Sequence, residues 1–298
     1  MSTLYTQQSN NTRKTWLLMS MFLIVVIAIG FAFARVYDNP NILYIFVAFS
    51  IVMNITGYWF SDKIALSIAG AKPATREQYF DLYNIMQNLS ITAGLPMPKI
   101  YVIPDNAPNA FATGRDKDHA VVAVTTGLLT IMDKSELEGV IAHELSHIGN
   151  RDMLVSTVAV VLVGFVSIVS DMFLRTSLWG GRGSNEREGS NWVAIVGIVL
   201  SILAPIAATL IQLAISRKRE YLADASGALL TRYPQGLASA LGKLRDYSQP
   251  MVKQSTAIAH LYISNPFGEG SKFGRKLGNI FSTHPPLDER IKLLMENK

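Results

Sequence analysis

The sequence predicts a mainly α-helical membrane protein with several spans, which also carries an α+β domain containing a small antiparallel sheet. Four long apolar runs interrupt the chain of 298 residues, and only 16% of its residues are charged, compared with about 25% in ordinary soluble domains. Between the runs, polar segments show both helical and strand-like spacing of apolar residues. The pattern therefore indicates membrane hairpins attached to one polar domain.

The first two runs, at 16–34 and 41–60, predict a transmembrane hairpin over residues 1–60. Neither run contains a charged residue, and Asn39-Pro40 between them is typical of a tight turn. The first run exceeds the apolar core of about 7–15 residues found in signal peptides, so we interpret it as a retained helix. At about 1.5 Å per residue, each run can cross about 30 Å of hydrocarbon.

Two further runs, at 153–174 and 192–215, predict a second transmembrane hairpin. Asp171 is the one charged residue in these runs, and Pro205 is a helix breaker of a kind that membrane helices tolerate. A re-entrant pair of helices is the alternative to two full crossings. Because no run carries a charge at its centre, a transporter is disfavoured.

The basic residues near the ends of the runs predict the orientation of the chain. If all four runs cross, one side of the membrane receives Arg13, Lys14, Lys63, Lys72 and the three basic residues at 217–219. The positive-inside rule places that side in the cytoplasm, at a plasma or inner membrane. The opposite loop also holds Arg175, Arg182 and Arg187, which runs against the rule for the second hairpin. The net charge of +5 forms no continuous basic face, so the expected partner is the lipid bilayer and not nucleic acid.

The polar segments at 61–152 and 217–298 are expected to fold together as one domain, 61–298, interrupted by the second hairpin. In the first segment, a helix is predicted over 76–93 with Gly94 as its C-cap. Strands are predicted at 99–103, 109–114 and 119–124, and a short helix at 125–132. Ser135 and Glu138 then match a capping box that opens an amphipathic helix through residue 147.

His143, Glu144 and His147 form an H-E-x-x-H motif on this last helix. A separation of four residues puts both imidazoles on one helix face, where they can bind one Zn²⁺. Glu144 lies beside them and can act as a general base towards water. The motif also arises by chance on surface helices, but the apolar neighbours Ile141 and Leu145 argue against an exposed helix. Since the chain has no cysteine, further ligands must be histidine or carboxylate.

A hydrolytic zinc site needs a third protein ligand and an open fourth position. Asp152 and His119 are candidates by residue type. Glu220 is favoured by its position in the chain. The third run directly follows the H-E-x-x-H helix, and Glu220 directly follows the fourth run. If the third and fourth runs pack as a hairpin, Glu220 is brought close to the two histidines. Asp224 lies one turn further on and is expected to orient a ligand histidine. The alternative is that 217–224 is only a charged helix end near the lipid head groups.

In this order, the motifs resemble the HtpX family of bacterial membrane-bound zinc metalloproteases, which is related to the CAAX prenyl protease. The resemblance covers nearly the whole chain and rests on two N-terminal spans, Asn109-Ala-Phe-Ala-Thr-Gly114, the H-E-L-S-H helix, two further spans, Ser216-Arg-Lys-Arg-Glu-Tyr-Leu-Ala-Asp224 and Thr283-His-Pro-Pro286. It implies a zincin-like α+β catalytic domain. It also implies one zinc ion per chain, bound by His143, His147 and Glu220, with Glu144 as the general base.

The resemblance extends to three more residues. Asn109 matches an asparagine that binds the substrate backbone from an edge strand, which suits an extended peptide. His284 and Arg290 match a pair near the metal that stabilises the transition-state oxyanion. From its position before two prolines alone, His284 could equally cap the final helix.

The expected activity is that of a zinc-dependent endopeptidase on the cytoplasmic face of the membrane. Its polypeptide substrates, on the resemblance, are misfolded or damaged membrane proteins, as part of a stress response. One alternative is a processing protease of narrow specificity, and another is a membrane scaffold that retains a structural zinc. Glu144 argues against the scaffold, because a structural zinc needs no base and is usually bound by four protein ligands.

Overall fold

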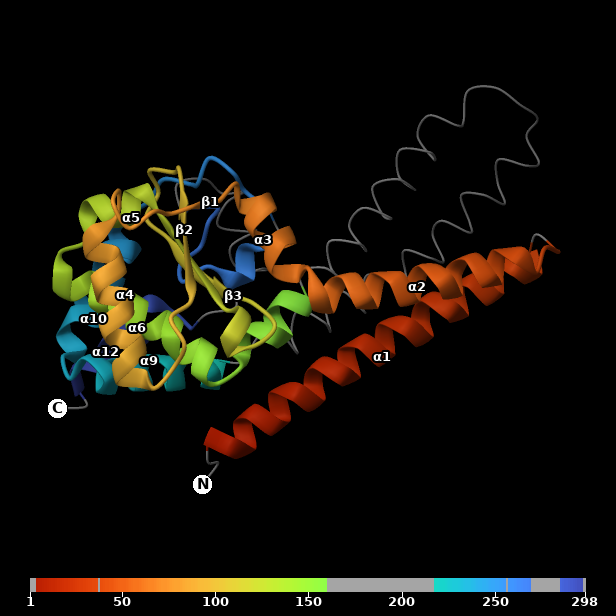
Figure 1. The fold of residues 1–298 in the computed structure, drawn as a ribbon, viewed down its shortest axis with the longest axis horizontal. Coiled ribbons are helices and arrows are strands. Elements are labelled where there is room, and N and C mark those ends of the chain that lie inside the picture. The colour runs from red at the N-terminus through yellow and green to blue at the C-terminus, as the bar shows by residue number, and fades with distance from the viewer. Residues whose placement is uncertain (1–3, 37, 160–216, 256, 269–284, 297–298) are drawn as a thin grey trace.

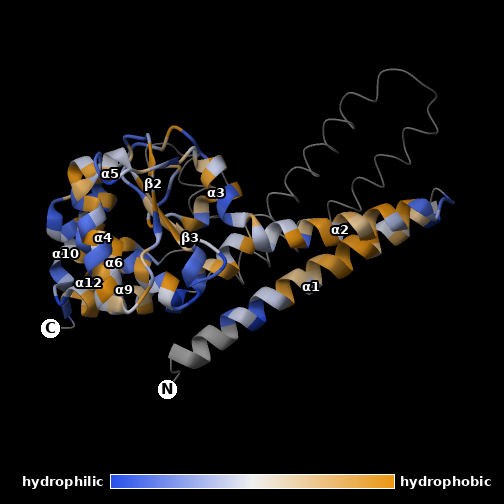
Figure 2. Ribbon diagram, viewed as in Figure 1, coloured by the Kyte–Doolittle hydropathy of each residue, from blue (hydrophilic) through white to orange (hydrophobic). Residues whose placement is uncertain are grey.

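Two long helices, α1 (Leu4–Val36) and α2 (Asn41–Trp59), form the predicted N-terminal hairpin in the computed structural model. The structure describes residues 4–36, 38–159, 217–255, 257–268 and 285–296. The hairpin projects from a globular domain, and apolar residues dominate its middle part, with hydrophilic residues at the turn between the two helices (Figures 1 and 2). By length and composition, Asn11–Arg35 and Asn41–Trp59 can each cross a membrane. Large apolar side chains such as Ile24 and Ile45 are exposed on both helices, which fits a lipid environment.

The second predicted hairpin falls almost entirely outside the described residues. Residues 152–159, at the start of its first run, are helical and follow a turn at 150–151, directly after the helix that ends at Gly149. The runs at 153–174 and 192–215 therefore keep the status of predictions.

The sheet has four strands in the order β1-β2-β4-β3. They are β1 (Lys72–Pro73), β2 (Lys99–Ile103), β3 (Ala110–Thr113) and β4 (Val121–Thr125). β2 and β4 pair in parallel, whereas β1–β2 and β3–β4 are antiparallel. The sheet is therefore mixed, and the prediction of an antiparallel sheet was wrong. β4 lies between β2 and β3 with all its residues buried, and burial on both faces is typical of parallel pairing.

Two apolar clusters lie on opposite faces of β4. Val122 and Val124 belong to the larger cluster, with α4 (Phe80–Ala93), α6 (Lys134–Gly149), α10 (Pro234–Asp246) and α12 (Leu287–Glu296). Val121 and Ala123 belong to the smaller cluster, with α3 (Ser61–Ala69) and part of the segment at 247–262. This alternation follows from the two-residue period of a strand. It leaves α6 inside the domain, against the sheet.

The remaining elements are short, apart from α9 (Arg217–Thr231), which packs along α6. They are η1 (Lys117–His119), α5 (Thr126–Ile131) and η3 (Ala259–Leu261). The predicted C-cap at Gly94 is confirmed: its φ is 64°, in the left-handed region that glycine adopts at little cost. The predicted short helix at 125–132 is confirmed as α5.

The first turn of α6 differs from its prediction. Asp133 is the N-cap, and it forms the capping box with Glu136 instead of Ser135 forming one with Glu138. The Asp133 carboxylate accepts from the backbone N–H of Glu136 at 2.9 Å, and the Glu136 carboxylate accepts from the N–H of Asp133 at 2.8 Å. Glu136 is fixed there by Ser239 and Lys243 of α10, which both donate to it at 2.6 Å. A tertiary contact therefore selects which of two overlapping capping patterns is used.

Candidate metal centre

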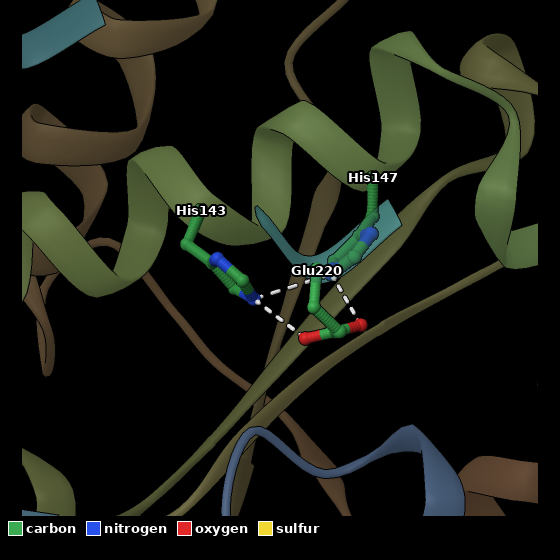
Figure 3. A group of neighbouring side chains, drawn as sticks. All are labelled: His143, His147 and Glu220. Atoms are coloured by element: carbon green, nitrogen blue, oxygen red, sulfur yellow. Dashed lines mark hydrogen bonds and ion pairs between the residues drawn. The ribbon is translucent and has the colours of Figure 1, made fainter. Parts of the chain in front are cut away.

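His143 and His147 lie one turn apart on α6 and direct their Nε2 atoms towards each other, 3.2 Å apart. His143 is fully buried, and His147 is partly buried. Because four residues make slightly more than one helical turn, both rings leave the same face of the helix. Figure 3 shows that this face looks towards the side chain of Glu220, which comes from α9.

The Glu220 carboxylate completes a group of three possible metal ligands. Its Oε2 lies 3.7 Å from His143 Nε2, and its Oε1 lies 3.6 Å from His147 Nε2. Ligand atoms about 2.0–2.2 Å from a tetrahedral Zn²⁺ are separated from one another by about 3.3–3.6 Å. The three separations in the structure are close to this range, so the donor set fits a zinc ion.

Close packing of α9 on α6 puts Glu220 in this position. Gly227, two turns after Glu220, faces the backbone of α6: a Cβ atom there would lie 3.0 Å from the backbone nitrogen of His143. No side chain larger than hydrogen fits without moving one of the helices. The glycine therefore allows the two helices to approach closely enough for their side chains to share one ion.

The second ring nitrogen of each histidine contacts a carboxylate. His143 Nδ1 lies 3.0 Å from Asp224 of α9, and His147 Nδ1 lies 3.2 Å from Asp152. Such contacts fix the ring orientation and the tautomer, with the proton on Nδ1 and the lone pair of Nε2 directed into the site. The predicted orienting contact of Asp224 is therefore present. Asp152, a candidate ligand by residue type, lies instead on the far side of His147.

Arg290, on α12, is fully buried beside these residues. Its Nε and Nη2 donate to the two carboxylate oxygens of Asp224 at 2.8 and 2.7 Å. Its Nη1 lies 3.9 Å from Glu220 Oε2 and, within the described part of the chain, makes no hydrogen bond. A bidentate pair of this kind fixes both partners. The predicted proximity of Arg290 to the histidines is thus observed, with one donor left for a further acceptor.

Burial and the neighbouring charges separate the pKa values of the two histidines. Burial lowers the pKa of His143 to about 4, although Asp224 opposes the shift. Burial would also lower the pKa of His147, but the negative charges of Glu220 and Asp152 raise it to about 9. For Asp224, burial alone would raise the pKa, and the charge and hydrogen bonds of Arg290 instead hold it at about 2. At neutral pH the site therefore holds a proton on His147, in a place where a cation is favoured.

Glu144 is buried next to His143 and is not among the three grouped ligands. Burial raises the pKa of its carboxyl group to about 7, while the positive charge of His147 and a hydrogen bond from the backbone N–H of Ala112 favour the ionised form. Ala112 lies on β3, an edge strand. A carboxyl group with a pKa near neutrality can accept and return a proton at physiological pH.

Asn109 is placed next to the edge strand, as predicted, but its side chain is already bonded within the chain. Its Nδ2 donates to the carbonyl of Ser264 at 3.0 Å, and its Oδ1 accepts from the N–H groups of Ser264 and Ala110. The carbonyl of Ala110, on the outer edge of β3, accepts from Ile263 at 2.9 Å. The segment at 263–264 therefore occupies the place next to Asn109 where an added peptide strand would pair.

The other predicted residues lie elsewhere. His119 is exposed at the turn between β3 and β4, where it contacts Asp116 and Arg115 and is not part of the histidine–glutamate group. His284 lies outside the described residues. Sequence reasoning missed the contact of Asp152 with His147; the signal available was a carboxylate five residues after the second histidine, just beyond the helix end.

Comparison with known proteins places the chain among peptidases. Residues 77–298 match peptidase family M48. A relative named "Protease HtpX homolog" from Caldanaerobacter subterraneus subsp. tengcongensis is 47% identical over 297 residues, covering 98% of this chain and 97% of the relative. Another of the same name, from Tropheryma whipplei (strain Twist), is 48% identical over 294 residues and covers 98% of each. The crystal structure of S. mikatae Ste24p matches 94% of this chain and 66% of its own, with a TM-score of 0.50 and 19% identity, which shows likeness of fold alone.

Proposed function

Since the chain belongs to peptidase family M48 and is a metalloprotease of the membrane, we propose that it is a zinc-dependent endopeptidase acting on the cytoplasmic face of the cell membrane. The family implies a metal. The observation that carries the proposal is the convergence of His143, His147 and Glu220, whose separations suit tetrahedral zinc. One zinc ion per chain would be held there, with a fourth position open.

We propose that Glu144 is the general base. His143, His147 and Glu220 would hold the zinc ion, which would supply Lewis-acid chemistry by making water more acidic and polarising the substrate carbonyl. Glu144 accepts the proton of the attacking water and transfers it to the leaving amine. Burial of the Glu144 carboxyl group raises its pKa, which favours holding the proton between the two transfers. The N–H of Ala112 orients its carboxylate, and Asp224 and Asp152 keep the two imidazoles in position.

Arg290 is proposed to stabilise the oxyanion that forms on the substrate carbonyl. Its Nη1 is buried and makes no hydrogen bond within the described residues, while its other two donors are fixed on Asp224. A charged donor held in advance at the place where negative charge develops lowers the barrier of acyl transfer. His284 is proposed as its partner on the family resemblance alone.

The proposed substrates are extended segments of misfolded or damaged membrane proteins. The resemblance to HtpX proteases supports this class, and the membrane hairpin beside the domain agrees with it. An extended peptide would pair with β3 and contact Asn109. Ser264 already bonds to the side chain of Asn109, and Ile263 bonds to the carbonyl of Ala110 on β3. The segment at 263–264 must therefore be displaced before a substrate reaches Asn109. A processing protease of narrow specificity is the competing proposal.

The test compares Glu144→Gln and Glu220→Ala with the unchanged chain, purified in detergent micelles. Zinc content is measured by elemental analysis, and hydrolysis with an unfolded polypeptide such as casein. Glu144→Gln is expected to retain one zinc ion and lose cleavage, because only the base is removed; Glu220→Ala is expected to lose the metal. Near-normal cleavage by Glu144→Gln would remove that residue from the mechanism, and stoichiometric zinc in Glu220→Ala would reassign the third ligand. Proteomics of membranes containing the active or the Glu144→Gln protein separates broad quality control from narrow processing.

A further inference from the structure

The membrane helix α1 reaches the metal centre through one buried side chain. Asn11, near the N-terminal end of α1, is 4% exposed. Its Nδ2 donates to Asp152 Oδ1 at 2.8 Å and to the backbone carbonyl of Asn150 at 3.0 Å. The other oxygen of Asp152 lies 3.2 Å from Nδ1 of His147. Two contacts therefore connect the membrane helix to an imidazole of the metal site.

We propose that Asn11 is a positioning residue of this metal centre, which fixes Asp152 and, through it, the ring of His147. The proposal rests on the proposed zinc site at His143, His147 and Glu220. It assigns to α1 a role beyond that of a membrane anchor: the zinc site reaches its full affinity only while the N-terminal helix is docked against the catalytic domain.

The packing of α1 explains why Asn11 meets Asp152 in a fixed register. The face of α1 that carries Asn11 continues with buried residues at helical spacing: Thr15, Leu18, Phe22 and Val26. The last three pack in one apolar cluster with residues of the helix at 152–159, namely Leu154, Val155, Val158 and Ala159. Asn11 is the polar end of this apolar contact. A buried asparagine at such a position sets the register of two packed helices, because its polar atoms are satisfied in one alignment only.

Arg219, a cation near Asp152, does not replace the Asn11 amide. Arg219 of α9 has its Nη1 3.5 Å from the same carboxylate oxygen, a longer contact than the 2.8 Å of the amide. Asn11 also bonds to the carbonyl of Asn150, directly after the end of α6. By bonding to both Asn150 and Asp152, it holds the short connection between the metal helix and the next helix. Without the amide, the Asp152 carboxylate is free to turn away from His147.

The expected effect is on metal affinity. Loss of a group that orients a metal-binding histidine typically lowers affinity by about 10–100-fold. Asn11 acts one contact further away, so Asn11→Ala is expected to weaken zinc binding by about 3–10-fold, below that range. Asp152→Ala should lower the zinc affinity by the full range of about 10–100-fold, because Asp152 contacts the ligand histidine directly. In an Asp152→Ala background, Asn11→Ala should have no further effect, because the residue through which it acts is absent.

The experiment measures zinc dissociation constants of the full chain in micelles by competition with a chromophoric chelator. The matched control is Asn54→Ala on α2: Asn54 is a partly buried asparagine of the same hairpin, whose amide donates within its own helix, to Ser50. A second readout is the visible absorption spectrum of the Co²⁺-substituted protein, which reports ligand geometry. Asn11→Ala should shift this spectrum, and Asn54→Ala should leave both spectrum and affinity unchanged.

The outcomes separate this inference from the proposed function. If Asn11→Ala keeps the affinity and spectrum of the unchanged chain, or if its effect persists undiminished in the Asp152→Ala background, the positioning role is overturned while the zinc site stands. If the unchanged chain binds no zinc, the proposed site itself fails. Should Asn11→Ala not fold, Asn11→Asp keeps the side-chain size but replaces the donor with a second carboxylate; normal zinc affinity in that variant would equally overturn the inference.

Discussion

Replacing Asp224 and Arg290, singly and together, tests how the buried ion pair supports the metal site. Both residues are almost fully excluded from solvent, and two hydrogen bonds of 2.8 and 2.7 Å join them. At a charge separation of about 4 Å and an effective dielectric constant of about 20, their attraction is about 4 kcal/mol. Asp224→Leu leaves the guanidinium without its partner, and Arg290→Met leaves a buried carboxylate. Each is expected to cost about 3–5 kcal/mol.

The double variant is expected to be much less damaged than the sum of the two single changes. Replacing both charges with apolar side chains removes the desolvation cost together with the attraction, so the coupling energy should be about 2 kcal/mol or more. The assay is thermal unfolding of the metal-free protein in micelles, followed by circular dichroism. Each single change should lower the melting temperature by roughly 10 °C. Strictly additive losses in the double variant would refute the reasoning, because independent sites show no coupling.

Three further predictions follow from the packing and charges around α6. Gly227→Ala should cost about 1–3 kcal/mol by overpacking α9 against the α6 backbone, and it should weaken zinc binding. The control is Gly242→Ala on α10, whose added Cβ would meet open space outside its own helix among the described residues. Thermal melting and chelator competition measure both variants. Zinc affinity should rise about tenfold per pH unit between about pH 7 and 9, because His147 must release the proton that it holds below its pKa of about 9. Calorimetry in buffers of different ionisation enthalpy counts that proton. A flat pH profile would contradict the conclusion that His147 is protonated at neutral pH. Asp133→Ala should lower the unfolding free energy by about 1 kcal/mol through loss of the N-cap of α6. Ser135→Ala should change it by only a few tenths of a kcal/mol. Equal losses in the two variants would restore Ser135 as the cap.

Local patterns were sufficient for most helices and strands. The run at 41–60, the strand at 99–103 and the helix that ends before Gly94 follow from spacing and end signals within a few residues. The run at 16–34 also matches a helix, but α1 begins well before it, at Leu4. The sheet order was not predictable in this way, because β2 and β4 pair with each other although β3 lies between them in the sequence. The prediction of the N-cap of α6 was wrong for a related reason: two capping patterns overlap in the sequence, and contacts from α10 decide between them.

The sequence by itself determined the reacting face: the H-E-x-x-H spacing places His143 and His147 on one face through the period of one helix, which requires no distant contact, and puts Glu144 directly after the first histidine. The tertiary structure decided how the predicted partners Glu220 and Arg290 reach that face, and that Asn109 bonds within the chain. Gly227 lets α9 bring in Glu220, the bidentate pair places Arg290, and Ser264 takes the amide of Asn109. These contacts join segments far apart in the chain, and each depends on the shape and burial of both surfaces, which no local pattern of residues specifies.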